Sequence, residues 1–216
     1  MKRNGASIAV VLVVGVTAGV AWAAPEAGTF SSSWLLDFQF HDPQRLSVRL
    51  PGDQEETTFW YVLYNVTNNT KMDIQFYPSF RLVTDTLQGV EGGADVSPIV
   101  YDLIAAQHKK EFPFLAPPAK ITGLLLQGEE NARASVAVFR EFAREANSIT
   151  IYVSGLSGEI VRVRNPAFDP KKSETEVNAR AFLMRRTLAI SYGLPGDDKS
   201  VTRAIPVRRT RTWVMQ

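Results

Sequence analysis

The 216-residue chain has no cysteine and only two histidines. The lack of cysteine excludes disulfides, thiolate metal sites, a cysteine nucleophile and a lipid-anchored lipoprotein. His41 and His108 are too few for the multi-histidine sites of zinc hydrolases. A Ser-His-Asp triad would need one of these two histidines, and no G-x-S-x-G motif accompanies them. The fold must therefore be stabilised by packing, and metal, cofactor and triad chemistry are not expected.

The chain also lacks long apolar runs, apart from one near its start. Lys2 and Arg3 precede the apolar stretch 8–20, and Ala21-Trp22-Ala23 matches the small-x-small pattern that signal peptidase recognises through Ala21 and Ala23. At about a dozen residues the stretch is shorter than the roughly 20 that a membrane-spanning helix needs. We therefore predict that residues 1–23 form a signal helix, cleaved after Ala23.

Export to the periplasm or the extracellular space follows from this prediction. The alternative is an uncleaved helix from Gly5 to Ala24 that tethers the protein to the membrane, with Lys2 and Arg3 on the cytoplasmic side. Residues 24–32 have no periodicity and predict a flexible N-terminus of the mature chain. Residues 33–216 have the length of a single domain.

Once the leader is removed, the chain also has no net charge. The whole chain carries a formal charge of +2, which Lys2 and Arg3 supply. A neutral mature domain argues against a general attraction to nucleic acid or to an anionic membrane, and leaves room for a local charged patch.

What the sequence does contain is alternation of apolar and polar residues with a period of two, which is typical of half-buried strands. The clearest strand is Phe59 to Thr67, where Trp60, Val62, Tyr64 and Val66 form an apolar face. Further strands are predicted at 34–40, 46–50, 72–82, 121–126, 135–139, 148–153, 160–164, 179–192 and 207–215.

Turn and helix signals complete this pattern. Asn68-Asn69 predicts a tight hairpin turn into the next strand, and Pro78 predicts an edge or a break in that strand. Ser97-Pro98 predicts the start of a short helix over 99–108. The predicted fold is mainly β, a β-sandwich with one short inserted helix, because a parallel α/β fold would need repeated helical crossovers.

The segment Trp60-Tyr61-Val62-Leu63-Tyr64-Asn65-Val66-Thr67-Asn68-Asn69-Thr70 resembles the second strand of immunoglobulin-like domains in secreted bacterial proteins. Leu126-Gln127-Gly128-Glu129 and the turn Gly155 to Glu159 resemble features of uncharacterised exported proteins of that type. The resemblance covers most of residues 34–216 and implies an immunoglobulin-like β-sandwich and export. It transfers no catalytic or binding residue, and the inserted helix departs from a minimal domain of this kind.

Arginines supply the strongest candidate patch. Five of them come together if the last two strands pair, and clustered guanidinium groups bind phosphate, sulfate or carboxylate. The candidate anion-patch residues are Arg185, Arg186, Arg208, Arg209 and Arg211. Because the mature domain has no net positive charge, the favoured explanation is that these arginines protect an edge strand from aggregation.

Acidic and aromatic residues suggest weaker candidates. Three carboxylate pairs can supply acid and base groups for hydrolysis, but solvated turns are the favoured explanation for them: Asp197-Asp198, Glu129-Glu130 and Glu55-Glu56. Asp85, Glu91 and Asp95 can gather around calcium, although their spacing matches no EF-hand. Aromatic residues of the strands can stack on sugars if several of them are exposed on one face, and otherwise belong to the core. These residues are Trp34, Trp60, Tyr61, Tyr64 and Tyr77.

The informative residues therefore serve strands and turns. They favour a non-enzymatic binding or scaffolding module of the bacterial envelope, without cofactor or metal, whose partner is an envelope protein or a glycan and not nucleic acid. A secreted hydrolase using loop carboxylates and a carbohydrate- or anion-binding domain are the alternatives.

Overall fold

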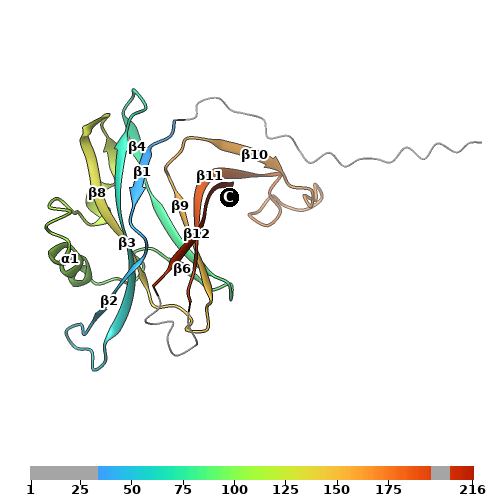
Figure 1. The fold of residues 1–216 in the computed structure, drawn as a ribbon. Coiled ribbons are helices and arrows are strands. Elements are labelled where there is room, and N and C mark those ends of the chain that lie inside the picture. Colours follow the sequence, from blue (N-terminus) through green and yellow to red (C-terminus); the bar gives the residue numbers. More distant parts are fainter. Residues whose placement is uncertain (1–33, 196–204) are drawn as a thin grey trace, which may run out of the picture.

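The computed structural model describes residues 34–195 and 205–216. These residues form a mainly β structure with several sheets and two helices, which confirms the predicted class (Figure 1). The predicted signal helix and the N-terminus at 24–32 lie outside the described residues. Within the described part of the chain, no helix is long and apolar enough to cross a membrane.

The first sheet is built around β3 (Thr57–Asn68). One edge of β3 pairs with β1 (Asp37–Phe40) and then with β2 (Gln44–Val48), and the other edge pairs with β8 (Gly128–Arg140). All pairs are antiparallel. The aromatic and β-branched residues that predicted β3 therefore place it at the centre of this sheet.

The second sheet follows the order β12, β11, β9, β5, β6, and β10 pairs with the first part of β11. The last two strands pair antiparallel, as the predicted arginine cluster required. The bounds of these strands are β5 (Ser79–Thr84), β6 (Gly89–Glu91), β9 (Ser148–Ser154), β10 (Ile160–Arg164), β11 (Ala181–Gly193) and β12 (Val207–Met215).

Two clusters of buried apolar residues cover the two faces of the first sheet. The inner core joins both sheets, and includes Trp60, Val62 and Tyr64 of β3 with Ile151 and Ile190 of the second sheet. The outer core lies on the opposite face of β3 and consists of Phe59, Tyr61, Leu63, Val100, Ile104, Val136 and Val138. Because α1 (Pro98–Gln107) supplies Val100 and Ile104, the helix is a third layer on the first sheet (Figure 1).

The helix begins as its sequence predicts. Ser97 is the N-cap, its hydroxyl oxygen accepts a hydrogen bond from the Ile99 amide, and Pro98 occupies the first turn. A second, four-residue helix, α2 (Pro118–Ile121), did not follow from the sequence pattern.

The predicted hairpin at Asn68-Asn69 is wrong. The next strand, β4 (Ile74–Phe76), pairs with β7 (Gly123–Leu125) in a separate two-stranded sheet. The Asn68 carboxamide donates to the carbonyls of Met72 and Leu125, and so ties the end of β3 to this small sheet. The break at Pro78 is confirmed, because it separates β4 from β5.

Candidate functional site

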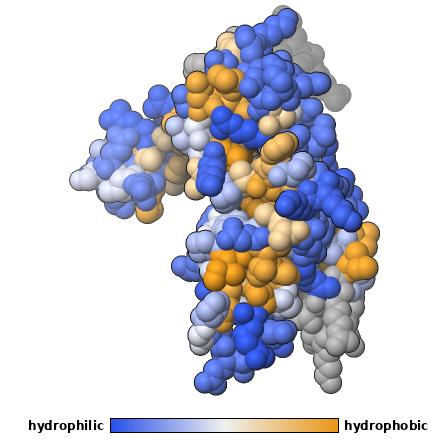
Figure 2. All heavy atoms as spheres, turned by 90° about the vertical axis from the view of Figure 1, so that its left-hand side faces the viewer, coloured by the Kyte–Doolittle hydropathy of each residue, from blue (hydrophilic) through white to orange (hydrophobic). Residues whose placement is uncertain are grey.

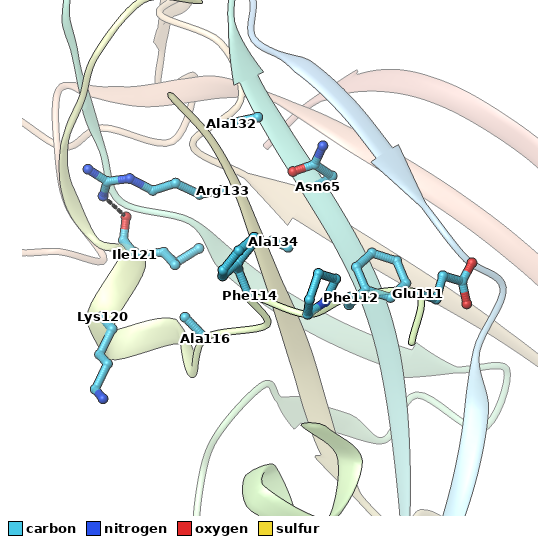
Figure 3. A pocket seen from close by; sticks show the side chains of 11 residues that line it. Asn65, Glu111, Phe112, Phe114, Ala116, Lys120, Ile121, Ala132, Arg133 and Ala134 are labelled. Atoms are coloured by element: carbon cyan, nitrogen blue, oxygen red, sulfur yellow. Dashed lines mark hydrogen bonds between the residues drawn. The ribbon is translucent and has the colours of Figure 1, made fainter. Parts of the chain in front are cut away.

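The outer face of the first sheet is only partly covered by α1. Beyond the helix, the chain segment 111–121 crosses the same face and encloses an open hollow of about 480 Å³ (Figure 3). The floor of the hollow consists of Asn65 of β3 with Ala132 and Ala134 of β8. Since the two alanines are small, the volume in front of them stays unfilled. Ligand pockets commonly span about 300–1,000 Å³.

The walls of the hollow are mostly apolar. Phe112, Pro113, Phe114, Ala116 and Ile121 line it, and the Phe114 side chain is 88% exposed. Figure 3 shows the side chains of these residues grouped over the strands. A large aromatic ring so exposed has little folding role, because its apolar area remains in water.

Hydrogen bonds hold the wall segment against β8. The Ala116 amide donates to the Ala134 carbonyl at 3.1 Å, and the Ser135 hydroxyl donates to the Ala116 carbonyl at 2.7 Å. The Arg133 guanidinium donates to the carbonyls of Ile121 and Leu124 at 2.8 and 2.6 Å. The hollow is therefore built into the fold.

The polar groups at the hollow are few and have different roles. Arg133 hydrogen-bonds to the wall segment, and the Lys120 side chain extends away from the cavity (Figure 3). Glu111 lies at one end. Asn65 is on the floor, and among the described residues no group hydrogen-bonds to its carboxamide. The hollow thus offers a surface on which apolar and polar area are mixed, with one amide that can both donate and accept.

On the space-filling view of the side that carries α1 and β8, apolar residues gather in several patches among hydrophilic ones (Figure 2). Exposed apolar side chains of α1, the 111–121 segment and β7 are Ile99 and Leu103, Phe114, and Leu124. Clustered exposed apolar area of this kind marks binding surfaces.

The two histidines lie beside the hollow, in one polar cluster. The Tyr61 hydroxyl hydrogen-bonds to His108 Nε2 at 2.9 Å and donates to Gln44 Oε1 at 3.0 Å. His41 Nε2 lies 3.4 Å from a Glu111 oxygen. The sequence does not bring these groups together, because His41 precedes β2 and His108 follows α1.

Burial shifts the pKa of two groups in this cluster, Tyr61 and His108. It raises the pKa of the Tyr61 hydroxyl, and it is the main reason that the pKa of His108 lies below its usual value, with Glu111 acting in the opposite direction and His41 in the same direction. Tyr61, which is 0% exposed, therefore stays neutral and cannot act as a base. The cluster is suited to fastening the 108–112 segment to the sheet.

Comparison with family models, with curated proteins and with solved structures finds no match for this chain.

Three of the five candidate anion-patch arginines interact with other residues of the chain. Arg186 lies 3.0 Å from a Glu159 oxygen and stacks over Trp213, at 4.9 Å from the ring centre. Arg208 lies 2.6 Å from Asp42, and both Arg208 and Arg211 lie over the Phe40 ring.

The other two patch arginines are exposed. Arg185 exchanges backbone hydrogen bonds with Gln216, and the Arg209 guanidinium lies against Gly193. The five residues thus occupy neighbouring strands, but Arg186, Arg208 and Arg211 are engaged within the chain. Whether the group binds an anion stays a prediction.

The acidic candidates are dispersed. Glu55-Glu56 is exposed in the loop before β3, Glu129-Glu130 is exposed at the start of strand β8 and not in a turn, and Asp197-Asp198 lies outside the described residues. Asp85 accepts hydrogen bonds from the Asn147 amide, and Glu91 lies 3.1 Å from Arg81. Within the described ranges no three acidic or histidine side chains form a group that can hold a metal ion.

Most of the aromatic candidates belong to the core. Trp60, Tyr61 and Tyr64 are buried, Trp34 is half-buried, and Tyr77 is 63% exposed. They do not form an exposed stacking surface. The exposed ring at the hollow is Phe114, which the sequence pattern does not single out because it lies in a proline-rich segment without periodicity.

Proposed function

We propose that this chain is an exported, non-enzymatic binding module that holds an apolar group of a partner protein in the hollow beneath Phe114. The carrying observation is a preformed cavity of about 480 Å³ with apolar walls and the Asn65 carboxamide, to which no described residue hydrogen-bonds. Such a cavity buries an apolar side chain, while the Asn65 amide can pair with a nearby peptide group of the partner.

A binding role is favoured over hydrolysis by the state of the nearby polar groups. The Tyr61 hydroxyl is already bonded to Gln44 and His108. Glu111 faces His41 at 3.4 Å, and none of these contacts presents an activated hydroxyl to the cavity. The hollow therefore provides a surface for binding, and the contacts of these groups indicate no hydrolytic reaction.

The proposal also includes an immunoglobulin-like fold and export to the bacterial envelope. The resemblance of residues 60–70 to secreted immunoglobulin-like domains supports an immunoglobulin-like β-sandwich, and the two sheets sharing the inner core agree with a sandwich. The leader pattern with Ala21 and Ala23 supports export to the bacterial envelope.

A glycan is the second candidate partner. The exposed Phe114 ring can stack on the apolar face of a sugar, and the Asn65 carboxamide can bond to a sugar hydroxyl. In this alternative, the flat face of a sugar ring takes the place of the partner protein's apolar side chain in the hollow.

Binding can be tested with two defined probe sets: extended peptides that each carry one Phe, Leu or Ile, and neutral oligosaccharides. We expect a peptide with an apolar side chain to bind, and Phe114→Ser to weaken this binding at least about tenfold, as expected for an aromatic anchor. Leu87→Ser is the matched control, because Leu87 is 87% exposed at a distant turn and should leave the affinity unchanged.

Three outcomes contradict the proposal. These are no binding by either probe set, equal loss of affinity in both variants, and chemical turnover of a bound probe. Binding of sugars alone would replace the protein partner with the glycan.

A further inference from the structure

The first part of β11 and all of β10 form a two-stranded hairpin that projects away from the two sheets (Figure 1). Together with the connecting loop it spans residues 160–186, here called the arm. The loop is ordered by Asn178, whose carboxamide donates to the carbonyls of Asp169 and Ser173 and accepts from the Asp169 amide. The arm is thus a built feature that is separate from the hollow.

Positive charge is concentrated in the arm. It carries seven basic and three acidic side chains, whereas residues 24–216 as a whole carry equal numbers of each. The arm is therefore formally +4 and the remainder of residues 24–216 is formally −4. This separation of charge gives the molecule one end that an anionic surface attracts and a body that it repels.

One face of the hairpin holds three arginines without ion pairs. In the antiparallel register Arg162 lies opposite Leu183, Arg164 opposite Ala181 and Arg185 opposite Ile160, which places all six on one face. The acidic residues nearby are largely engaged, since Asp169 faces Lys172 at 3.8 Å and Glu174 faces Arg180 at 3.4 Å. Among the described residues, no carboxylate pairs with Arg162, Arg164 or Arg185.

Exposed apolar side chains accompany these charges. Leu183 is 65% exposed among the three arginines, Phe182 is 44% exposed on the opposite face, and Val177 in the loop is 91% exposed. A soluble loop gains nothing from such exposure. A lipid interface accepts it, because apolar side chains enter the boundary of the acyl chains while basic groups pair with headgroups.

We propose that the arm docks the protein onto the surface of an anionic lipid bilayer, with Arg162, Arg164 and Arg185 on the headgroups and Leu183 and Val177 at the interface. A projecting hairpin suits a flat surface, whereas an acidic protein partner would not require the exposed apolar side chains. The proposal is independent of the hollow.

The test measures co-sedimentation of the chain that begins at Ala24 with vesicles of phosphatidylcholine alone and of phosphatidylcholine with phosphatidylglycerol. This chain keeps every described element and lacks the apolar leader, which would itself bind lipid. We expect binding only to the anionic vesicles, decreasing with salt. Replacing Arg162, Arg164 and Arg185 together by Gln should weaken it by roughly 100-fold, as expected for three basic groups at the surface.

Matched variants separate the arm from overall charge and overall apolarity. Arg49→Gln with Lys109→Gln and Arg140→Gln removes the same charge from exposed sites elsewhere, and we expect it to leave vesicle binding nearly unchanged. Val177→Ser with Leu183→Ser should weaken binding, whereas Leu87→Ser with Leu126→Ser should not.

Equal binding to neutral vesicles, no binding to anionic vesicles, or equal effects of the arm variants and their controls would overturn the proposal. Binding to polyglutamate that is as strong as binding to vesicles, and that the Val177 and Leu183 substitutions do not change, would also overturn it. The partner would then be an acidic polymer. Loss of peptide binding in the hollow leaves these outcomes unaffected.

Discussion

At the scale of single residues, Asn68 ties the end of β3 to the small sheet of β4 and β7. Its carboxamide donates to Met72 and Leu125 at 2.8 and 2.9 Å and accepts from the amide and the hydroxyl of Thr70. Asn68 is 0% exposed and its bond to the Leu125 carbonyl is buried, so a replacement removes a donor from that buried carbonyl.

We therefore expect Asn68→Ala to lower the free energy of unfolding by about 1–3 kcal/mol. Urea denaturation measures this change. The control is Asn131→Ala, which removes a half-buried asparagine whose own hydrogen bond to a backbone carbonyl is exposed to solvent, and it should cost much less. Equal losses in the two variants would mean that the Asn68 bonds do not hold the small sheet.

The second residue-scale prediction concerns pH. The pKa of His108 is lowered in the folded chain, mainly by burial, so the unfolded chain binds more protons than the folded chain just below the ordinary pKa of about 6.5. Stability should therefore be fully present above that pH and decrease as the pH falls below it. His108→Gln, which keeps a polar partner for Tyr61, should reduce this decrease.

Urea denaturation at several pH values between about 5 and 8 checks this expectation. An unchanged pH profile in His108→Gln would show that another group causes the pH dependence.

At the scale of elements, α1 is a structural layer. Ile104 is 0% exposed against β3 and β8, whereas Leu103 on the same helix is 38% exposed. Ile104→Ala should cost about 2–5 kcal/mol because it leaves a cavity in the outer core. Leu103→Ala is the control and should cost under about 1 kcal/mol. Thermal or urea unfolding distinguishes the two, and a small loss in Ile104→Ala would mean that α1 is dispensable.

The same elements indicate how far sequence pattern reaches. Alternation located most strands, and the Ser97-Pro98 signal located α1, because both depend on local rules. The hairpin after Asn68 could not be predicted correctly, since the Asn68 side chain bonds to Leu125, which is 57 residues away. The alternation pattern predicted β3 as a half-buried strand, whereas in the structure α1 covers its second face.

At the scale of the whole molecule, the candidate site arises from contacts between distant segments. Asn65 and Ala134 lie side by side because β3 pairs with β8. The residue pattern of neither strand predicts the register of that pair. Phe114 reaches them only because Ala116 is hydrogen-bonded to Ala134 and Ser135. The sequence thus predicted the strands that form the floor and not the hollow itself.

Two surfaces with different chemistry divide the molecule. The hollow has apolar walls and lies on the outer face of the first sheet, and the arm is a basic projection from the second sheet. The proposed docking of the arm on a bilayer and the proposed binding of a partner in the hollow therefore use separate surfaces.

The most direct measurement of the central proposal is the nuclear magnetic resonance spectrum of the mature chain, titrated with the peptide that binds best. The account predicts that the largest changes occur at the Asn65 side-chain amide and at the methyl groups of Ala132 and Ala134, and that Ala134→Leu, which fills the floor, removes them without unfolding the chain. Changes that centre on other residues, or that persist in Ala134→Leu, would contradict it.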